Sequence, residues 1–150
     1  MDSRLDEATE GDRDAMAAVL EACGLSPSGI LAPGTLYWVC RAQNELLGTC
    51  GIEPGNGCAL LRSVCVVRKR RGNRIAERLV SRALLEAARL GLRDVYLFSK
   101  DTGGYFERLG WREVTVAEVA ARLPEAPQVR RYEAIGWYPD ERAFVRNAAT

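Results

Sequence analysis

The chain has 150 residues, 47% hydrophobic and 27% charged, which is long enough for one sizeable core and too short for two ordinary domains. Its 21 basic and 20 acidic residues give a formal net charge of +1, so no global field favours nucleic acid or an anionic membrane. Without any histidine, His-based triads, His-ligated zinc sites and imidazole general bases are excluded. We expect one domain over residues 1–150, with carboxylates, tyrosine, cysteine or bound water as proton carriers.

The sequence also predicts a cellular compartment. No apolar run approaches the ~20 residues of a membrane helix, and the start MDSRLDEATEGDRD is too polar for a secretory signal. The five cysteines are odd in number and form no CxxC pair, so we interpret them as reduced core residues. We therefore expect a cytoplasmic protein. The cysteines are Cys23, Cys40, Cys50, Cys58 and Cys65.

The first half of the chain predicts a strand, a helix and three further strands. Thr9 is the expected cap of the helix and Gly24 ends it, because the apolar residues between them follow helical spacing. Leu25 to Gly34, rich in proline and glycine, is a connection of the kind that often covers a site. Pro54-Gly55-Asn56-Gly57 is typical of a hairpin turn. The expected strands are Arg4 to Ala8, Leu36 to Cys40, Glu45 to Glu53 and Cys58 to Val67.

Helices and strands alternate in the second half, as is typical of α/β domains. The basic run Arg68 to Arg74 leads into a long amphipathic helix that stops at Gly91. The strands expected after it are Asp94 to Ser99, Trp111 to Val116 and a last one near Ala143 to Val145. The expected helices are Tyr105 to Leu109, Ala117 to Leu123 and Val129 to Ile135.

The succession of strand, basic glycine-containing loop and helix predicts an anion site. A helix N-terminus presents unpaired amides and a partial positive charge, so Arg71 to Ala76 are placed to hold a pyrophosphate without a metal. The alternative is that the basic residues only form a solvated face.

Two segments carry a resemblance to a known family. Val64-Cys65-Val66 followed by KRRGNRIAERLV resembles the acyl-CoA-binding motif Q/R-x-x-G-x-G/A of the GNAT N-acetyltransferase superfamily. Arg71 and Ala76 match its first and last positions, whereas Arg74 replaces the middle glycine. The segment YLFSKDTGGYFERLGW is similar to the strand and helix that follow in these enzymes, with Phe106 where many relatives have a proton-donating tyrosine. Its neighbour Tyr105 is a candidate for that role, and packing is the alternative.

The resemblance implies an α/β GNAT fold, a mixed, mostly antiparallel twisted sheet with helices on both faces. It implies transfer of an acetyl group from acetyl-CoA to an amine by direct attack, with acetyl-CoA as co-substrate and no metal. Acetyl-CoA is expected between the strand Leu60 to Val66 and the strand Val95 to Ser99. The implied cofactor-binding residues are Val64, Cys65, Val66, Arg71, Gly72, Asn73, Arg74, Ile75, Ala76 and Glu77.

Arg62 interrupts the apolar run LLRSVCVV, and a buried guanidinium needs an anionic partner. It is interpreted either as a bidentate clamp on a substrate carboxylate, with Ser63 beside it, or as half of an internal ion pair with Glu53. The run resembles GNAT enzymes that act on amino acids, including the arsinothricin N-acetyltransferase-like group linked to arsenic resistance and short N-acetylglutamate synthases. This implies a substrate such as arsinothricin, phosphinothricin or glutamate.

Glu53 is the candidate catalytic carboxylate, because it could relay the proton of the substrate ammonium through water. The alternative is a surface turn residue. Two other functions stay open: a non-catalytic CoA-binding sensor or interaction module, and an N-acetyltransferase of proteins or aminoacyl-tRNA. We expect a small-molecule amine as partner and neither nucleic acid nor membrane, and a homodimer is left open.

Overall fold

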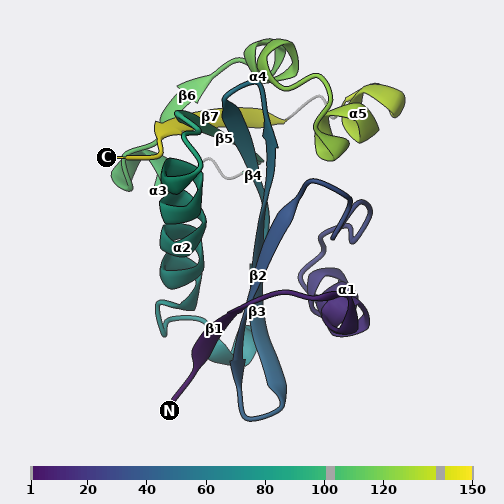
Figure 1. Ribbon diagram of the computed structural model, residues 1–150, viewed down its shortest axis with the longest axis vertical. Coiled ribbons are helices and arrows are strands. Elements are labelled where there is room, and N and C mark those ends of the chain that lie inside the picture. Colours follow the sequence, from purple (N-terminus) through teal and green to yellow (C-terminus); the bar gives the residue numbers. More distant parts are fainter. Residues whose placement is uncertain (1, 101–103, 138–140, 150) are drawn as a thin grey trace. The chain divides into compact units, whose positions relative to one another are not determined.

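The computed structural model describes residues 2–100, 104–137 and 141–149. Within them, seven strands follow one another across a sheet in the order β1-β2-β3-β4-β5-β7-β6 (Figure 1). The β4–β5 pair is parallel, and the β1–β2, β2–β3, β5–β7 and β6–β7 pairs are antiparallel. The strands are β1 Arg4–Glu7, β2 Leu36–Ala42, β3 Glu45–Gly55, β4 Cys58–Val66, β5 Asp94–Ser99, β6 Arg112–Val114 and β7 Arg142–Asn147.

The helices occur where the sequence predicts them, with small differences at their ends. The last helix begins at Pro127, earlier than expected, because proline fits the first helical position, where no amide hydrogen is needed. The α-helices are α1 Arg13–Ala22, α2 Ile75–Arg89, α3 Tyr105–Arg108, α4 Val116–Arg122 and α5 Pro127–Ala134, and the short 3₁₀ helices, which were not predicted, are η1 Glu10–Asp12 and η2 Arg68–Arg70.

The chain divides into two compact units, and each is described by itself. Unit 1 consists of Met1–Ile52 and Arg62–Ala83, and unit 2 consists of Glu53–Leu61 and Leu84–Thr150. The expectation of a single domain stays a prediction.

In unit 1, helices cover both faces of β2. Tyr37 belongs to the same core cluster as Met16 and Leu20 of α1. The next residue, Trp38, points to the opposite face, because side chains alternate along a strand. There the Arg82 guanidinium of α2 lies 5.4 Å from the centre of the Trp38 ring. The expected arrangement of sheet and helices is thus present within this unit.

In unit 2, β7 separates two sets of helical contacts in the same way. Val145 packs in a core cluster with Val119 of α4 and Val129 of α5. Phe144 points to the other face, where its ring centre lies 5.4 Å from that of Phe106 in α3. The mixed, mostly antiparallel sheet with helices confirms the predicted fold class.

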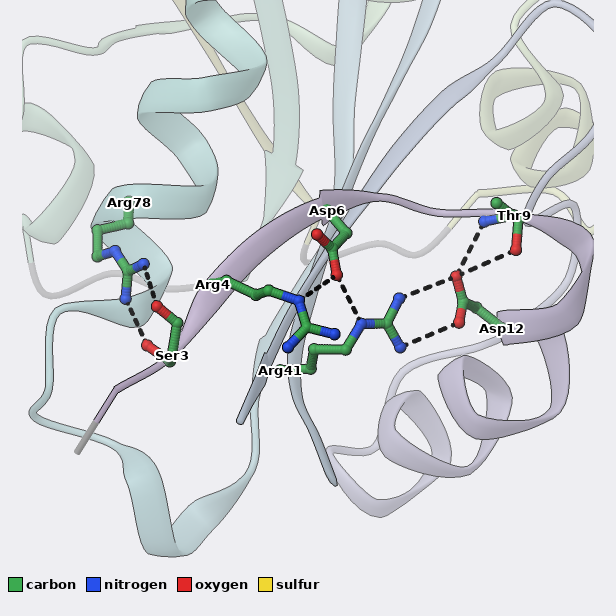
Figure 2. A network of polar contacts seen from close by, with 7 residues as sticks. All are labelled: Ser3, Arg4, Asp6, Thr9, Asp12, Arg41 and Arg78. Atoms are coloured by element: carbon green, nitrogen blue, oxygen red, sulfur yellow. Dashed lines mark hydrogen bonds and ion pairs between the residues drawn. The ribbon is translucent and has the colours of Figure 1, made fainter. Parts of the chain in front are cut away.

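A network of charged groups fastens β1 to β2 in unit 1 (Figure 2). The guanidinium of Arg41 lies between two carboxylates, donating to Asp6 Oδ2 at 2.8 Å and to Asp12 Oδ1 at 3.2 Å. The Thr9 amide also donates to Asp12, at 2.9 Å. The hydrogen bond from Arg41 lowers the pKa of Asp6. Burial alone would raise the pKa of Asp12, but the hydrogen bonds from Thr9 and Arg41 outweigh it and lower the pKa.

Replacing Arg41 with methionine is expected to lower the Tm near neutral pH by about 2–4 °C, because Asp6 and Asp12 both lose their ion pair with Arg41, while Asp6 keeps its ion pair with Arg4. Both folded-state pKa values lie below the usual 3.8, so this stabilisation is present above 3.8 and is lost as the pH falls through the folded-state values. Melting curves of wild type and Arg41→Met should therefore converge in acid. If the Tm difference between the two proteins is as large well below pH 3.8 as at neutral pH, the stabilisation does not come from these ion pairs. Arg112→Met, at an exposed position, is the control.

Candidate functional site

The strand predicted to line the cofactor is irregular at Ser63. This residue has a φ of +60°, in the left-handed region that residues with side chains rarely adopt. The hydroxyl of Thr49, a fully buried residue of β3, donates to the Ser63 carbonyl at 2.6 Å. The hydrogen bond holds a kink in β4 directly before Val64, Cys65 and Val66. Val64 is half-buried, and Cys65 and Val66 are buried.

Arg62 lies immediately before this kink and is only 5% exposed. Its Nε donates to Ser63 Oγ at 3.0 Å, and its Nη2 donates to the carbonyls of Ser28 at 2.8 Å and Ser26 at 3.5 Å. Ser26 and Ser28 belong to the connection expected to cover a site. Uncharged oxygens of unit 1 thus help to orient the guanidinium. The carboxylate clamp and the internal ion pair with Glu53 both stay predictions.

The loop before α2 turns through two residues in the left-handed region. Gly72 has a φ of +93° and Arg74 a φ of +58°. Arg74 therefore has a glycine-like conformation at the position where the motif has its middle glycine. The Arg78 amide donates to the Arg74 carbonyl at 3.1 Å, so Ile75, Ala76 and Glu77 form the first turn, where amides have no helical acceptor. Gly72, Asn73 and Arg74 are exposed, whereas Ile75 is buried.

Two basic side chains near this loop contact the protein itself. Lys69 pairs with Glu45 at 2.6 Å, and this contact lowers the pKa of Glu45. Arg71 donates from Nε to the Val66 carbonyl at 3.2 Å, and its Nη2 lies 3.8 Å from Cys23 Sγ. Arg71 therefore connects the loop to the end of β4, although the motif predicts it as a cofactor-binding residue.

The cysteines differ from the expectation that all five are reduced. Cys23, which follows α1, and Cys65 of β4 form a disulfide with their Cα atoms 6.6 Å apart. They are 42 residues apart in the sequence, so tertiary packing brings them together without a local motif. Cys40, Cys50 and Cys58 are free and buried, as predicted. Burial raises the pKa of the Cys50 thiol.

In unit 2, Glu53 is a buried strand residue. It is 1% exposed, so the alternative of a surface turn residue is wrong. Its Oε1 accepts a hydrogen bond from the backbone amide of Gln128 at 3.0 Å. Gln128 lies in the first turn of α5, where the helix dipole favours a negative charge. Glu53 therefore has the buried, oriented carboxylate that a proton relay needs, and its catalytic role stays a prediction.

Tyr105 is the other predicted catalytic residue. It begins α3, is 41% exposed, and meets the Phe106 ring edge-on with the ring centres 5.1 Å apart. Phe106 also packs against Trp111 and Phe144, so the position of the usual tyrosine is occupied by a packing residue. Tyr105 has a packing contact of its own, and its role as an acid stays a prediction.

The sequence pattern does not indicate a polar pair formed by Gln128, whose amide binds Glu53, and Tyr132. Gln128 Nε2 donates to the Tyr132 hydroxyl oxygen at 3.4 Å, within α5. The Tyr132 ring packs against Phe98 and Trp137, with ring centres 5.2 and 5.7 Å away. The only signal was the proline before Gln128, which is common at the first position of a helix and marks the amides that follow as available.

Residues 2–100, 104–137 and 141–149 contain neither a candidate membrane span nor a candidate metal cluster. None of their helices combines the length and the apolar character needed to cross a membrane. Their cysteine, aspartate and glutamate side chains form no cluster of three or more that could hold a metal ion.

Comparison with known proteins identifies the family. Residues 33–113 match the family described as Acetyltransferase (GNAT) domain. The uncharacterized N-acetyltransferase YjgM of Escherichia coli K12 is 30% identical over 95 residues, which are 57% of this chain and 56% of YjgM. The chain thus matches little more than half the length of that relative.

Solved structures share the fold at low sequence identity. A GNAT-family acetyltransferase from Staphylococcus aureus Mu50 has a TM-score of 0.78 at 15% identity, over 98% of this chain and 99% of that one. N-acetylglutamate synthase from Neisseria gonorrhoeae, complexed with coenzyme A and N-acetyl-glutamate, has a TM-score of 0.74 at 17% identity, over 99% of this chain and 35% of that one. Because the family match spans more than half of the chain, the protein belongs to the GNAT acetyltransferase domain family.

Proposed function

We propose that the protein transfers the acetyl group of acetyl-CoA to the amine of a small amino acid or amino-acid analogue, in the cytoplasm. The observation that carries the proposal is the conformation of Arg74, which has a φ of +58° at the glycine position of the CoA motif. A residue that replaces the glycine while keeping its backbone conformation leaves the first-turn amides of α2 available for a pyrophosphate.

Gly72 to Glu77 are the proposed pyrophosphate ligands, through their backbone amides. The left-handed conformation costs Arg74 about 1 kcal/mol relative to glycine, and its exposed guanidinium offsets this when it pairs with a CoA phosphate. Val64, Cys65 and Val66 would align the pantetheine through their backbone groups. An amide at Val64 or Cys65, directly after the Ser63 kink, would polarise the acetyl carbonyl.

Arg62 is the proposed ligand of the substrate carboxylate. Ser63, Ser26 and Ser28 orient the guanidinium through its Nε and Nη2 atoms, and Nη1 is the donor proposed to bind the substrate carboxylate. Candidate substrates are glutamate and its phosphinic and arsenical analogues, phosphinothricin and arsinothricin.

Glu53 would accept the ammonium proton through water, leaving a neutral amine. The amine nitrogen attacks the thioester carbonyl carbon, the carbon–sulfur bond breaks, and CoA leaves as a thiolate. The nitrogen releases its second proton to water as the amide forms, and the thiolate takes a proton from Tyr105 or water. Where Tyr105 gives the proton, water returns one to the phenolate. The products are the N-acetylated substrate and CoA, without an acyl-enzyme. The rival proposal is CoA binding without catalysis, which is favoured by the packing of Phe106 at the usual tyrosine position.

Acetyl-CoA at millimolar concentration is expected to raise the Tm of the wild type. Arg74→Gly should raise the Tm without ligand by about 2–4 °C, because strain is relieved, and should reduce the shift that acetyl-CoA causes, because a phosphate ligand is lost. Differential scanning fluorimetry measures both effects. Unchanged melting of the wild type in acetyl-CoA would contradict the proposal.

An assay of thiol release then distinguishes acetyl transfer from CoA binding without catalysis. Release of CoA with glutamate, other amino acids or the phosphinic and arsenical analogues supports the transferase. A clear thermal shift with no release on any of these amines supports the non-catalytic alternative.

A further inference from the structure

Gln128 carries a side-chain oxygen, Oε1, that is buried and has no hydrogen-bond partner among the described residues. Native proteins contain few such atoms, because a buried acceptor loses its water without compensation. The backbone amide of the same residue donates to Oε1 of Glu53 at 3.0 Å. The unpaired acceptor therefore belongs to the residue that holds the buried carboxylate.

The side chain of Gln128 is anchored through its other polar atom. Nε2 donates to the Tyr132 hydroxyl oxygen at 3.4 Å, which commits the nitrogen end of the amide to Tyr132. The ring of Tyr132 is itself packed against Phe98 and Trp137. The amide oxygen is thus held by a rigid aromatic group, as is required of an atom that positions a ligand.

An amide oxygen and a carboxylate both accept hydrogen bonds, so the ligand that suits them is a donor with several N–H groups. A primary ammonium has three donors, and the neutral primary amine keeps two after losing a proton. An amide oxygen cannot take up that proton at neutral pH. It can therefore hold the amine before and after Glu53 receives the proton.

We propose that Gln128 Oε1 binds the amine of the acyl acceptor beside Glu53 and makes the enzyme selective for primary amines. The inference rests on the proposed function, which brings an amino acid to this carboxylate. Once deprotonated, an N-methyl amine has a single N–H and cannot donate both to Gln128 Oε1 and to the water that leads to Glu53. A primary amine donates to both and keeps its lone pair for the thioester.

Gln128→Met is the test, because methionine keeps the length of the side chain and the backbone amide that binds Glu53 while removing both polar atoms. The KM for the amino acid is expected to rise about tenfold or more, and the preference for glutamate over N-methylglutamate to fall, because a hydrogen bond to a charged group is lost. The KM for acetyl-CoA should stay within about twofold. Gln43→Met is the matched control, because Gln43 is the other glutamine of the chain and is exposed. It should change neither the KM for the amino acid nor the preference for glutamate.

Tyr132→Phe provides a second variant if Gln128→Met does not fold, because it removes only the hydroxyl that anchors the amide. It too should reduce the preference for the primary amine. Calorimetry with glutamate in the presence of CoA separates this inference from the proposed function. The amine site is supported if the Gln128→Met variant no longer binds glutamate while the Gln43→Met variant still does. This holds even if no amine is turned over. Unchanged amine KM and glutamate affinity in a folded variant, or no glutamate binding by the wild type, overturns it.

Discussion

Gly48→Ala is expected to lower the Tm by about 5–10 °C and to weaken acetyl-CoA binding at the same time. A Cβ at Gly48 would lie 2.8 Å from the backbone oxygen of Cys65, 3.1 Å from Leu79 Cδ1 and 3.2 Å from Ile75 Cγ2. The first of these atoms belongs to β4 and the other two to α2, so a strand or a helix must shift to admit one methyl group. Because Cys65 and the first turn of α2 are proposed cofactor ligands, the same shift should disturb the cofactor site.

Gly11→Ala is the matched control within unit 1. There the nearest atom to an added Cβ is Thr9 Oγ1 at 3.6 Å, an ordinary contact. Its Tm should stay within about 2 °C of the wild type, since a single methyl on an open surface changes little. The two variants are compared by circular dichroism melting with and without acetyl-CoA. Equal Tm values for Gly48→Ala and Gly11→Ala would mean that there is room for a methyl group where Gly48 of β3 faces β4 and α2.

The sequence was sufficient for the fold because its hydrophobic periodicity changes clearly from element to element. The strand Asp94–Ser99 was predicted with its observed bounds. Asn56 and Gly57 both have positive φ, as the predicted hairpin turn requires. Helix α5 begins at Pro127, two residues before the start that the sequence predicts, because proline fits the first turn of a helix.

The sequence predicts those features of the candidate site that are local, such as the glycine-like position of Arg74, whose cofactor-binding role stays a prediction. Its tertiary features were not predicted. The disulfide joins Cys23 to Cys65, and the hydrogen bond that orients Glu53 comes from Gln128, 75 residues later. No local pattern reports such contacts, because side-chain spacing describes the face of an element and not the residues packed against it.

Arg62→Lys is expected to reduce turnover of carboxylate-bearing amino acids by roughly 10- to 100-fold, mainly through kcat/KM, because lysine keeps the charge but loses the planar guanidinium and its fixed donor directions. Nε of Arg62 binds Ser63 and Nη2 binds two carbonyls of the connection after α1. A single ammonium cannot reproduce this set of directions, so the substrate carboxylate loses its oriented partner. The thermal shift caused by acetyl-CoA should change little.

The controls separate a substrate ligand from a structural cation. Arg112→Lys makes the same exchange at an exposed position and should leave turnover unchanged. A simple amine without a carboxylate should be a poor substrate of the wild type and nearly insensitive to Arg62→Lys, because the clamp has nothing to bind. Circular dichroism must first show that Arg62→Lys folds, since a buried cation also affects stability. If the folded variant loses activity equally on both kinds of amine, Arg62 has a structural role, and recognition of a free amino acid loses its main support.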